Sequence, residues 1–204
     1  MPTTSIDAIS PIDHAMQRRV SAEVKRYLPV AESLYQRPFA DIEVLFDLKG
    51  RAAGMYRVKA PKVLTTALTK RLMRLPSLDF GVSAQVQRSI RFNPWLFAKY
   101  PEDSWQNTIP HEVAHYIADC LYGIKAIRPH GKEWQQIMRD LGAEPIVRAA
   151  YDLSGIPVRQ VRRYLYRCQC RDVPLTSYRH QKIQRGLQRY RCRDCGKQLR
   201  YSQA

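Results

Sequence analysis

The chain has 204 residues and a net charge of +16, and 45% of its residues are apolar. This apolar content is enough to bury a core, so a disordered chain is not the default expectation. No apolar run approaches the ~20 residues of a membrane helix and none near the N-terminus resembles a signal peptide, so we expect a cytoplasmic protein without a membrane partner.

The N-terminal part of the chain predicts a helix followed by a β-hairpin. Residues 12–36 have helical periodicity, and Pro29 is expected to kink or divide this helix. Residues 42–59 predict two strands, IEVLFDL and MYRV, joined by a turn at KGRAAG. Residues 1–11, ahead of the helix, are expected to be flexible. The apolar positions of the predicted helix include Val20, Val24, Leu28, Ala31 and Leu34.

The next stretch predicts a further helix and a strand. Residues 62–74 predict a helix that ends before Pro76. The segment SIRFNPWLF predicts a strand up to Asn93, with a turn at Pro94.

Two amphipathic helices are predicted in the second half of the chain. The first covers residues 104–122 and stops at Gly123. Pro110 lacks a backbone N–H, so this helix either begins near Thr108 or bends there. The second helix covers about residues 132–141. The apolar residues of the two helices are Ile109, Val113, Ile117 and Leu121 in the first and Trp134, Ile137, Met138 and Leu141 in the second.

The first of these helices carries the motif H-E-x-x-H at residues 111–115. Residues four apart share one face of a helix, so His111 and His115 can bind one ion. Neutral imidazole nitrogens suit Zn²⁺ at ~2.0–2.1 Å. Glu112 lies beside the first histidine, where it can act as the general base that activates a water. The motif predicts a catalytic zinc site, and an accidental match is the alternative.

A catalytic zinc site needs a third protein ligand. His130 is the preferred candidate, because the neighbouring Gly131 permits an unusual backbone angle that lets the imidazole reach the helix. Glu133 is the next candidate, since other zinc proteases use a glutamate from a second helix. Asp119 and Asp140 are further candidates, although Asp119 lies too close along the same helix to wrap around the ion.

Four of the five cysteines lie between residues 168 and 195, which favours a metal site over disulfides in an intracellular protein. Their two pairs resemble the halves of a structural zinc ribbon. The first pair is more tightly spaced than usual, so His180 is an alternative ligand, and free thiols are a further alternative. The two pairs are Cys168-x-Cys170 and Cys192-x-x-Cys195.

The C-terminal segment is strongly basic. Residues 155–204 hold 13 Lys and Arg and 2 Asp and Glu, a net charge of +11. This excess predicts binding to nucleic acid through phosphate contacts, and a solvated basic face is the alternative. Four tyrosines are candidates for base stacking, or for ordinary packing of a small module: Tyr164, Tyr166, Tyr190 and Tyr201. The candidate nucleic-acid contacts are Arg162, Arg163, Arg167, Arg179, Lys182, Arg185, Arg189 and Arg191.

In combination, these segments resemble the bacterial SprT proteins, which are relatives of the Spartan metalloproteases. The resemblance runs from about residue 40 to 200 and rests on PHEVAHYIA, RPHGKEWQQIM, YRCQC, SYRHQKIQRG and YRCRDCGKQL, preceded by GRAAGMYRV and IRFNPWLF. It implies an α+β protein, with a zincin-like catalytic domain of helices packed on a small sheet over residues 1–155. A basic zinc-ribbon-like module would follow over residues 156–204.

By motif position, the resemblance implies that His111, His115 and His130 are zinc ligands and that Glu112 is the general base. The chain departs from the family in its C-x-C spacing and in the interval 61–90, which looks like an insertion between two strands that could cover the substrate cleft. Spartan proteins cleave proteins attached to DNA.

We therefore expect a zinc metallopeptidase with one catalytic and one structural zinc ion, a protein substrate and a DNA partner. The alternative is a non-enzymatic zinc-containing protein that binds nucleic acid or acts as a regulator. The intact Glu112 argues against that alternative, because a purely structural zinc site does not require it.

Overall fold

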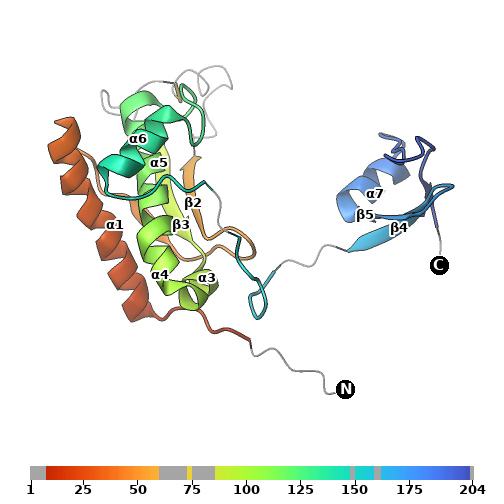
Figure 1. Cartoon of the computed structure of the whole chain (residues 1–204), viewed down its shortest axis with the longest axis horizontal. Helices are drawn as coiled ribbons and strands as arrows, with labels where there is room; N and C mark the ends of the chain where they lie inside the picture. Colours follow the sequence, from red (N-terminus) through yellow and green to blue (C-terminus); the bar gives the residue numbers. More distant parts are fainter. Residues whose placement is uncertain (1–7, 60–72, 75–85, 148–149, 159–161, 203–204) are drawn as a thin grey trace. The chain divides into compact units, whose positions relative to one another are not determined.

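The computed structural model describes residues 8–59, 73–74, 86–147, 150–158 and 162–202. The chain separates into two compact units, Met1–Val158 and Arg159–Ala204 (Figure 1). Each unit combines helices with a small sheet, which confirms the α+β class. None of the helices in the described part of the chain has the length and apolarity that a bilayer crossing requires.

The first unit begins with a long helix, α1 (His14–Tyr35). The side chain of Asp13 accepts a hydrogen bond of 2.8 Å from the Met16 N–H and so caps the first turn. The helix continues through Pro29, which therefore does not divide it. Its buried face consists of Val20, Val24, Leu28 and Ala31, as predicted.

The predicted apolar stripe of α1 is wrong at its last position, because Leu34 is 49% exposed. The stripe ends instead with Tyr35, which lies two helical turns after Leu28 and so on the same face. Tyr35 packs against the core, and its hydroxyl donates a hydrogen bond of 2.7 Å to Asp140.

The sheet of the first unit has the strand order β1-β3-β2, with β1 (Glu43–Leu45), β2 (Gly54–Lys59) and β3 (Gln87–Phe92). β3 runs parallel to β1 and antiparallel to β2. The hairpin predicted for residues 42–59 is therefore wrong, because β3 lies between its two strands. β3 is the most buried of the three strands, with Ser89, Ile90 and Phe92 all buried.

Several predictions fall wholly or partly outside the described residues. The segment expected to be flexible covers residues 1–11, of which residues 1–7 are not described. Within its described part, the Ile9 N–H donates a hydrogen bond of 3.0 Å to the Gly155 carbonyl, so this position is held against the first unit. The helix predicted over residues 62–74 also lies outside, apart from a turn at 73–74. Residues 87–90 of the proposed insertion belong to β3, and 60–72 and 75–85 are not described.

The strand predicted to end at Asn93 is confirmed as β3. The Asn93 side chain accepts hydrogen bonds from the N–H groups of Trp95 and Leu96, at 3.1 and 3.3 Å, and so caps α3 (Pro94–Lys99). The position predicted as a turn, Pro94, is the first residue of this helix.

A continuous helical segment leads into the motif helix. It consists of α4 (Pro101–Asp103), a π-helical turn η2 (Ser104–Thr108) and α5 (Ile109–Tyr122). In the π-helical turn, the Ile109 N–H donates to the Ser104 carbonyl, five residues earlier. The α-helix thus begins one residue before Pro110, where the missing N–H of a proline costs little.

The motif helix α5 occupies the centre of the first unit. It packs against α1, the sheet and α6 (Lys132–Asp140), and α1 and α5 lie side by side in Figure 1. α5 stops as predicted at Gly123, which has a φ of 83° and donates its N–H to Asp119. α6 buries Trp134, Ile137 and Met138, which confirms its predicted apolar face.

The second unit is a three-stranded antiparallel sheet with one helix. Its strand order is β5-β4-β6, with β4 (Arg163–Arg167), β5 (Asp172–Thr176) and β6 (Arg200–Tyr201), and the helix is α7 (Ser177–Gln184). Its small core consists of Tyr166, Leu175, Cys192 and Leu199.

Candidate metal centre

Three imidazoles converge at the motif helix. His111 and His115 lie four residues apart on α5, and the loop before α6 brings His130 to the same point. The Nε2 atom of His115 lies 3.2 Å from that of His111 and 3.1 Å from that of His130. The Nε2 atoms of His111 and His130 are also 3.1 Å apart. The structure therefore assembles the three histidines that the sequence analysis put together.

His130 reaches the cluster through its own backbone conformation. It has a φ of 57°, in the left-handed region that residues other than glycine rarely adopt. Such a conformation costs about 1–3 kcal/mol and is typical of functional sites. The unusual angle predicted for Gly131 is therefore wrong, since Gly131 has a φ of −70°. A Cβ atom at Gly131 would lie 2.9 Å from the Arg128 carbonyl, so glycine is needed there for close packing.

The acidic candidates for a third ligand have other positions. Among the described residues, the side chains that lie close enough to share one ion at this point are the three histidines, and Glu133 is not one of them. Asp140 accepts the hydrogen bond from Tyr35. Asp119 is buried and accepts hydrogen bonds from the Tyr56 hydroxyl at 2.6 Å, Arg88 Nε at 2.8 Å and the Ile124 N–H at 2.8 Å. These partners tie the end of α5 to β2, β3 and the following loop.

The histidines of α5 are held in the neutral form. Burial, together with the nearby His130, lowers the pKa of His111 to about 4. Burial, together with the other two imidazoles, lowers the pKa of His115 to about 3. His111 Nδ1 lies 3.2 Å from the carbonyl of Ile146. In a neutral ring this geometry puts the proton on Nδ1 and leaves a lone pair on Nε2.

The chemistry of this donor set fits a divalent cation. Each of the three Nε2 atoms lies within hydrogen-bond distance of the other two. A neutral imidazole has only one N–H, so the three nitrogens cannot supply enough protons for a hydrogen bond between every pair. A tetrahedral zinc ion at 2.0–2.1 Å from each nitrogen would separate the nitrogens by roughly 3.3 Å. The observed separations of 3.1–3.2 Å are close to that value.

Glu112 is buried beside this cluster. Its Oε2 accepts a hydrogen bond of 2.6 Å from the backbone N–H of Tyr56 on β2, and the residue is 5% exposed. Burial raises the pKa of Glu112 to about 8, and the Tyr56 N–H opposes this increase. A bound cation would also oppose it, because a nearby positive charge favours the carboxylate.

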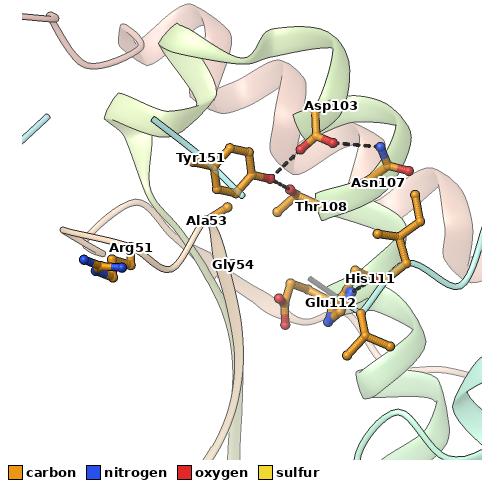
Figure 2. Close-up of a pocket in the computed structure, with 11 residues that line it drawn as sticks. Arg51, Ala53, Gly54, Asp103, Asn107, Thr108, His111, Glu112 and Tyr151 are labelled. Carbon is orange, nitrogen blue, oxygen red and sulfur yellow. Dashed lines mark hydrogen bonds between the residues drawn. The ribbon is translucent and has the colours of Figure 1, made fainter. Parts of the chain in front are cut away.

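Two cavities meet at His111 and Glu112. One, of about 260 Å³, has a polar wall that includes Asp103, Asn107 and Tyr151 (Figure 2). In this wall the Tyr151 hydroxyl donates to Asp103 and lies 3.3 Å from Thr108 Oγ1. The other cavity, of about 340 Å³, is lined by all three histidines and by apolar residues of β2, α5 and the following loop. The centre is therefore accessible from both sides of Glu112.

Sequence analysis missed the role of Gly54, the first residue of β2. A Cβ atom at this position would lie 2.5 Å from Glu112 Oε1 and 2.6 Å from Glu112 Cγ. Only glycine lets β2 approach the carboxylate so closely. The available signal was a glycine at the start of a predicted strand, which can indicate close backbone approach, but we assigned it to a turn. Tyr56 and Ile146 were also missed, because they act through backbone atoms that the sequence does not distinguish.

The four C-terminal cysteines form a second cluster. All four are free thiols, and their sulfur atoms lie within 4.8 Å of one another. The Sγ atoms of Cys168 and Cys170 are 3.3 Å apart, and those of Cys170 and Cys192 are 3.6 Å apart. Tetrahedral zinc with Zn–S bonds of 2.3 Å would separate the sulfurs by roughly 3.8 Å. Backbone N–H groups of Cys195 and Asp194 lower the pKa of Cys192 to about 6, which favours the ligating thiolate.

The structure does not support His180 as an alternative ligand in this cluster. Its ring stacks on Tyr164 with centroids 3.7 Å apart, and its Nδ1 lies 3.0 Å from the Tyr166 hydroxyl. Tyr166 is fully buried, so its proposed role in base stacking is wrong. His180 covers one face of Tyr164, whereas Tyr201 is 39% exposed.

The basic candidates of the second unit lie on its surface. All are exposed except the half-buried Lys182. Arg167 is paired with Asp172 at 2.8 Å. Three other cations lie over tyrosine rings: Arg162 over Tyr164, Arg179 over Tyr190 and Lys182 over Tyr178. Cations and aromatic rings thus alternate on this unit.

The fold and the two donor clusters define a mixed α/β protein with two candidate metal sites. The model of the SprT-like family matches residues 24–159. The chain belongs to this family.

Curated relatives match both units of the chain. It is 34% identical over 190 residues to "Protein SprT" of Pseudomonas fluorescens, a match that covers 92% of this chain and 96% of the relative. It is 33% identical over 189 residues to "Protein SprT" of Pseudomonas syringae pv. tomato, with the same coverage. "Protein SprT" of Pseudomonas aeruginosa is 34% identical over 183 residues, 88% of this chain and 92% of the relative. No solved structure matches the chain.

We predict that Gly54→Ala strains the packing of Glu112. The added methyl group would overlap the carboxylate, so the free energy of unfolding should fall by about 1–3 kcal/mol. In a Glu112→Ala background the same change should be neutral or stabilising by about 0.5–1 kcal/mol, because alanine is the better residue where there is no clash. Urea unfolding of the four proteins measures this difference. An equal cost in both backgrounds would show that the close approach is not what requires glycine.

We predict that the purified chain binds two divalent ions, which can be counted by elemental analysis. His130→Ala should remove one ion and Cys192→Ala the other, because each residue belongs to a different donor cluster. Glu133→Ala is the matched control for the first site and should retain both ions. Loss of both ions from a single substitution would contradict two independent sites.

Proposed function

We propose that this chain is a zinc-dependent metallopeptidase. The observation that carries the proposal is the convergence of three imidazoles beside a buried glutamate, at a point where two cavities meet. His111, His115 and His130 would hold the ion. When bound, zinc supplies Lewis-acid activation of a water and of the peptide carbonyl.

In this proposal Glu112 is the general base. Its Oε2 is engaged by the Tyr56 N–H, so Oε1 is the atom that takes the proton from the attacking water. The same carboxyl then delivers the proton to the leaving amine. Burial favours the protonated form of this carboxyl, and a bound cation would favour the carboxylate, so the two effects on the pKa of Glu112 oppose each other.

The two cavities suit a polypeptide substrate. They share Gly54, His111 and Glu112, so a chain that passes over the metal centre can place side chains on both sides of the peptide bond. The arrangement of a metal helix packed beside a small sheet is consistent with a zincin-like domain, which we propose for the first unit.

We propose that the second unit is a zinc-ribbon-like module that binds DNA and brings the peptidase to DNA-associated proteins. Its net charge of +11 and its exposed arginines support this role. Tyr190 and Tyr201 remain candidates for stacking on bases, since each is at least partly accessible, whereas His180 and Arg162 already lie over the ring of Tyr164.

The alternative is a non-enzymatic DNA-binding or regulatory protein with structural zinc. A structural zinc site is filled by four protein ligands. It has no open coordination position and does not need a buried carboxyl beside the ion. The position of Glu112, at the junction of two cavities, favours the enzyme.

We predict that Glu112→Gln lowers the rate of peptide cleavage by about 10²–10⁴-fold, because glutamine cannot take a proton. Glutamine has nearly the same shape and can still accept the Tyr56 hydrogen bond, so zinc content and thermal stability should remain at wild-type values. Cleavage of a basic DNA-binding protein, followed on gels with single-stranded, double-stranded or no DNA, measures the effect. A wild-type chain that binds both ions and cleaves nothing in any of these conditions would favour the non-enzymatic alternative.

We predict that DNA binding weakens steeply with salt. About six phosphate contacts would lower the affinity roughly 10³-fold between 50 and 200 mM salt. Replacing one contacting residue, Arg179→Ala, should reduce the slope of log affinity against log salt by about one. Arg26→Ala on α1, where the arginine is paired with Glu23, is the matched control and should leave the slope unchanged. A flat titration of the wild-type chain by fluorescence anisotropy would argue against a DNA partner.

A further inference from the structure

One buried aromatic side chain contacts all three histidines of the metal centre. Trp134 lies on α6, and its ring centroid is 4.7 Å from that of His111, 5.5 Å from that of His115 and 4.8 Å from that of His130. Trp134 is 1% exposed, so the indole is fixed within the core.

The indole is also joined to the motif helix. Its Nε1–H donates a hydrogen bond of 3.3 Å to the carbonyl of His111. α6 begins at Lys132, two residues after His130, so Trp134 links the segment that carries the third imidazole to the helix that carries the other two. The ring planes of His111 and His130 meet the indole at 63° and 82°, an edge-to-face packing that favours one orientation of each ring.

An ion can bind three histidines only when all three adopt the correct side-chain rotamers together. Free imidazoles would have to lose this freedom on binding, which weakens the affinity, whereas rings already packed against a rigid wall have little left to lose. In this structure the Nε2 atoms are held at 3.1–3.2 Å from one another with the indole packed against their rings.

We propose that Trp134 is a positioning residue that holds the three imidazoles in the arrangement that binds the ion. This inference rests on the proposed function of the first unit. The apolar face of α6 predicts only that Trp134 fills the core. The inference assigns it a second role. Residues that orient metal ligands typically change the metal affinity 10- to 100-fold when they are replaced.

The test compares Trp134→Phe and Trp134→Leu with the wild-type chain in a cobalt titration. Phenylalanine keeps an aromatic wall but loses the Nε1–H and half of the bicyclic ring, and leucine loses the wall. Trp95→Phe is the matched control, because Trp95 lies against Lys49 and belongs to a different cluster of the core. Cobalt bound by imidazoles is followed by its visible absorption, and cobalt bound by the cysteines by its thiolate charge-transfer band.

We expect cobalt binding at the histidine site to weaken about 10-fold in Trp134→Phe and up to about 100-fold in Trp134→Leu. The visible spectrum should change with the ligand geometry. The cysteine site should keep its affinity in every variant and so serves as an internal control. Melting temperatures of the metal-free proteins show how much of each effect comes from lost core packing.

The inference would be overturned if the folded Trp134 variants bound cobalt at the histidine site as tightly as the wild-type chain, with the same spectrum. If Trp134→Leu fails to fold, Trp134→Phe alone decides between these outcomes. A wild-type chain that binds cobalt only at the cysteines would instead contradict the proposed function and remove the basis of the inference. The two failures are therefore distinguishable.

Discussion

The meeting of three imidazole nitrogens at 3.1–3.2 Å is the constraint around which the first unit is arranged. Neutral rings with converging lone pairs are unfavourable unless a cation satisfies them. The surrounding fold carries several features that hold them there. These include a left-handed residue at His130, a carbonyl from Ile146 that fixes the proton of His111, and the indole of Trp134 against all three rings.

Local patterns predicted the parts of the site that depend on helical spacing. His111, Glu112 and His115 could be placed because residues four apart share a helix face, and α6 could be placed from its apolar stripe. His130 was preferred for its loop position beside Gly131 and was implied by the family resemblance, but the reason given for its reach was wrong, since the unusual φ belongs to His130 rather than to Gly131. Sequence patterns do not reveal which of two adjacent residues takes the rare conformation.

Contacts between distant segments could not be predicted from the sequence. β1 and β2 follow each other closely in the sequence, which suggested a hairpin. In the structure β3 lies between them, and it has the most buried side chains of the three strands. Gly54 resembled a turn residue, although its function is to leave room for Glu112. In the second unit, Tyr164 and Tyr166 lie on the same face of β4 and alternate with the exposed Arg163, Leu165 and Arg167. Tyr166 was grouped with the accessible tyrosines because the sequence does not show that the rest of the unit covers this face.

Tyr56 binds α5 at two points, with its N–H at Glu112 and its hydroxyl at Asp119, two helical turns further on. A strand that is hydrogen-bonded to a helix at one point can rotate or shift relative to that helix. Two hydrogen bonds, two helical turns apart along α5, restrict both movements of β2. Slippage of β2 by a single residue would turn the tyrosine ring to the opposite side of the sheet and release both bonds together. The Glu112 carboxyl and the edge strand β2 are thus mechanically coupled, so that displacing one would displace the other.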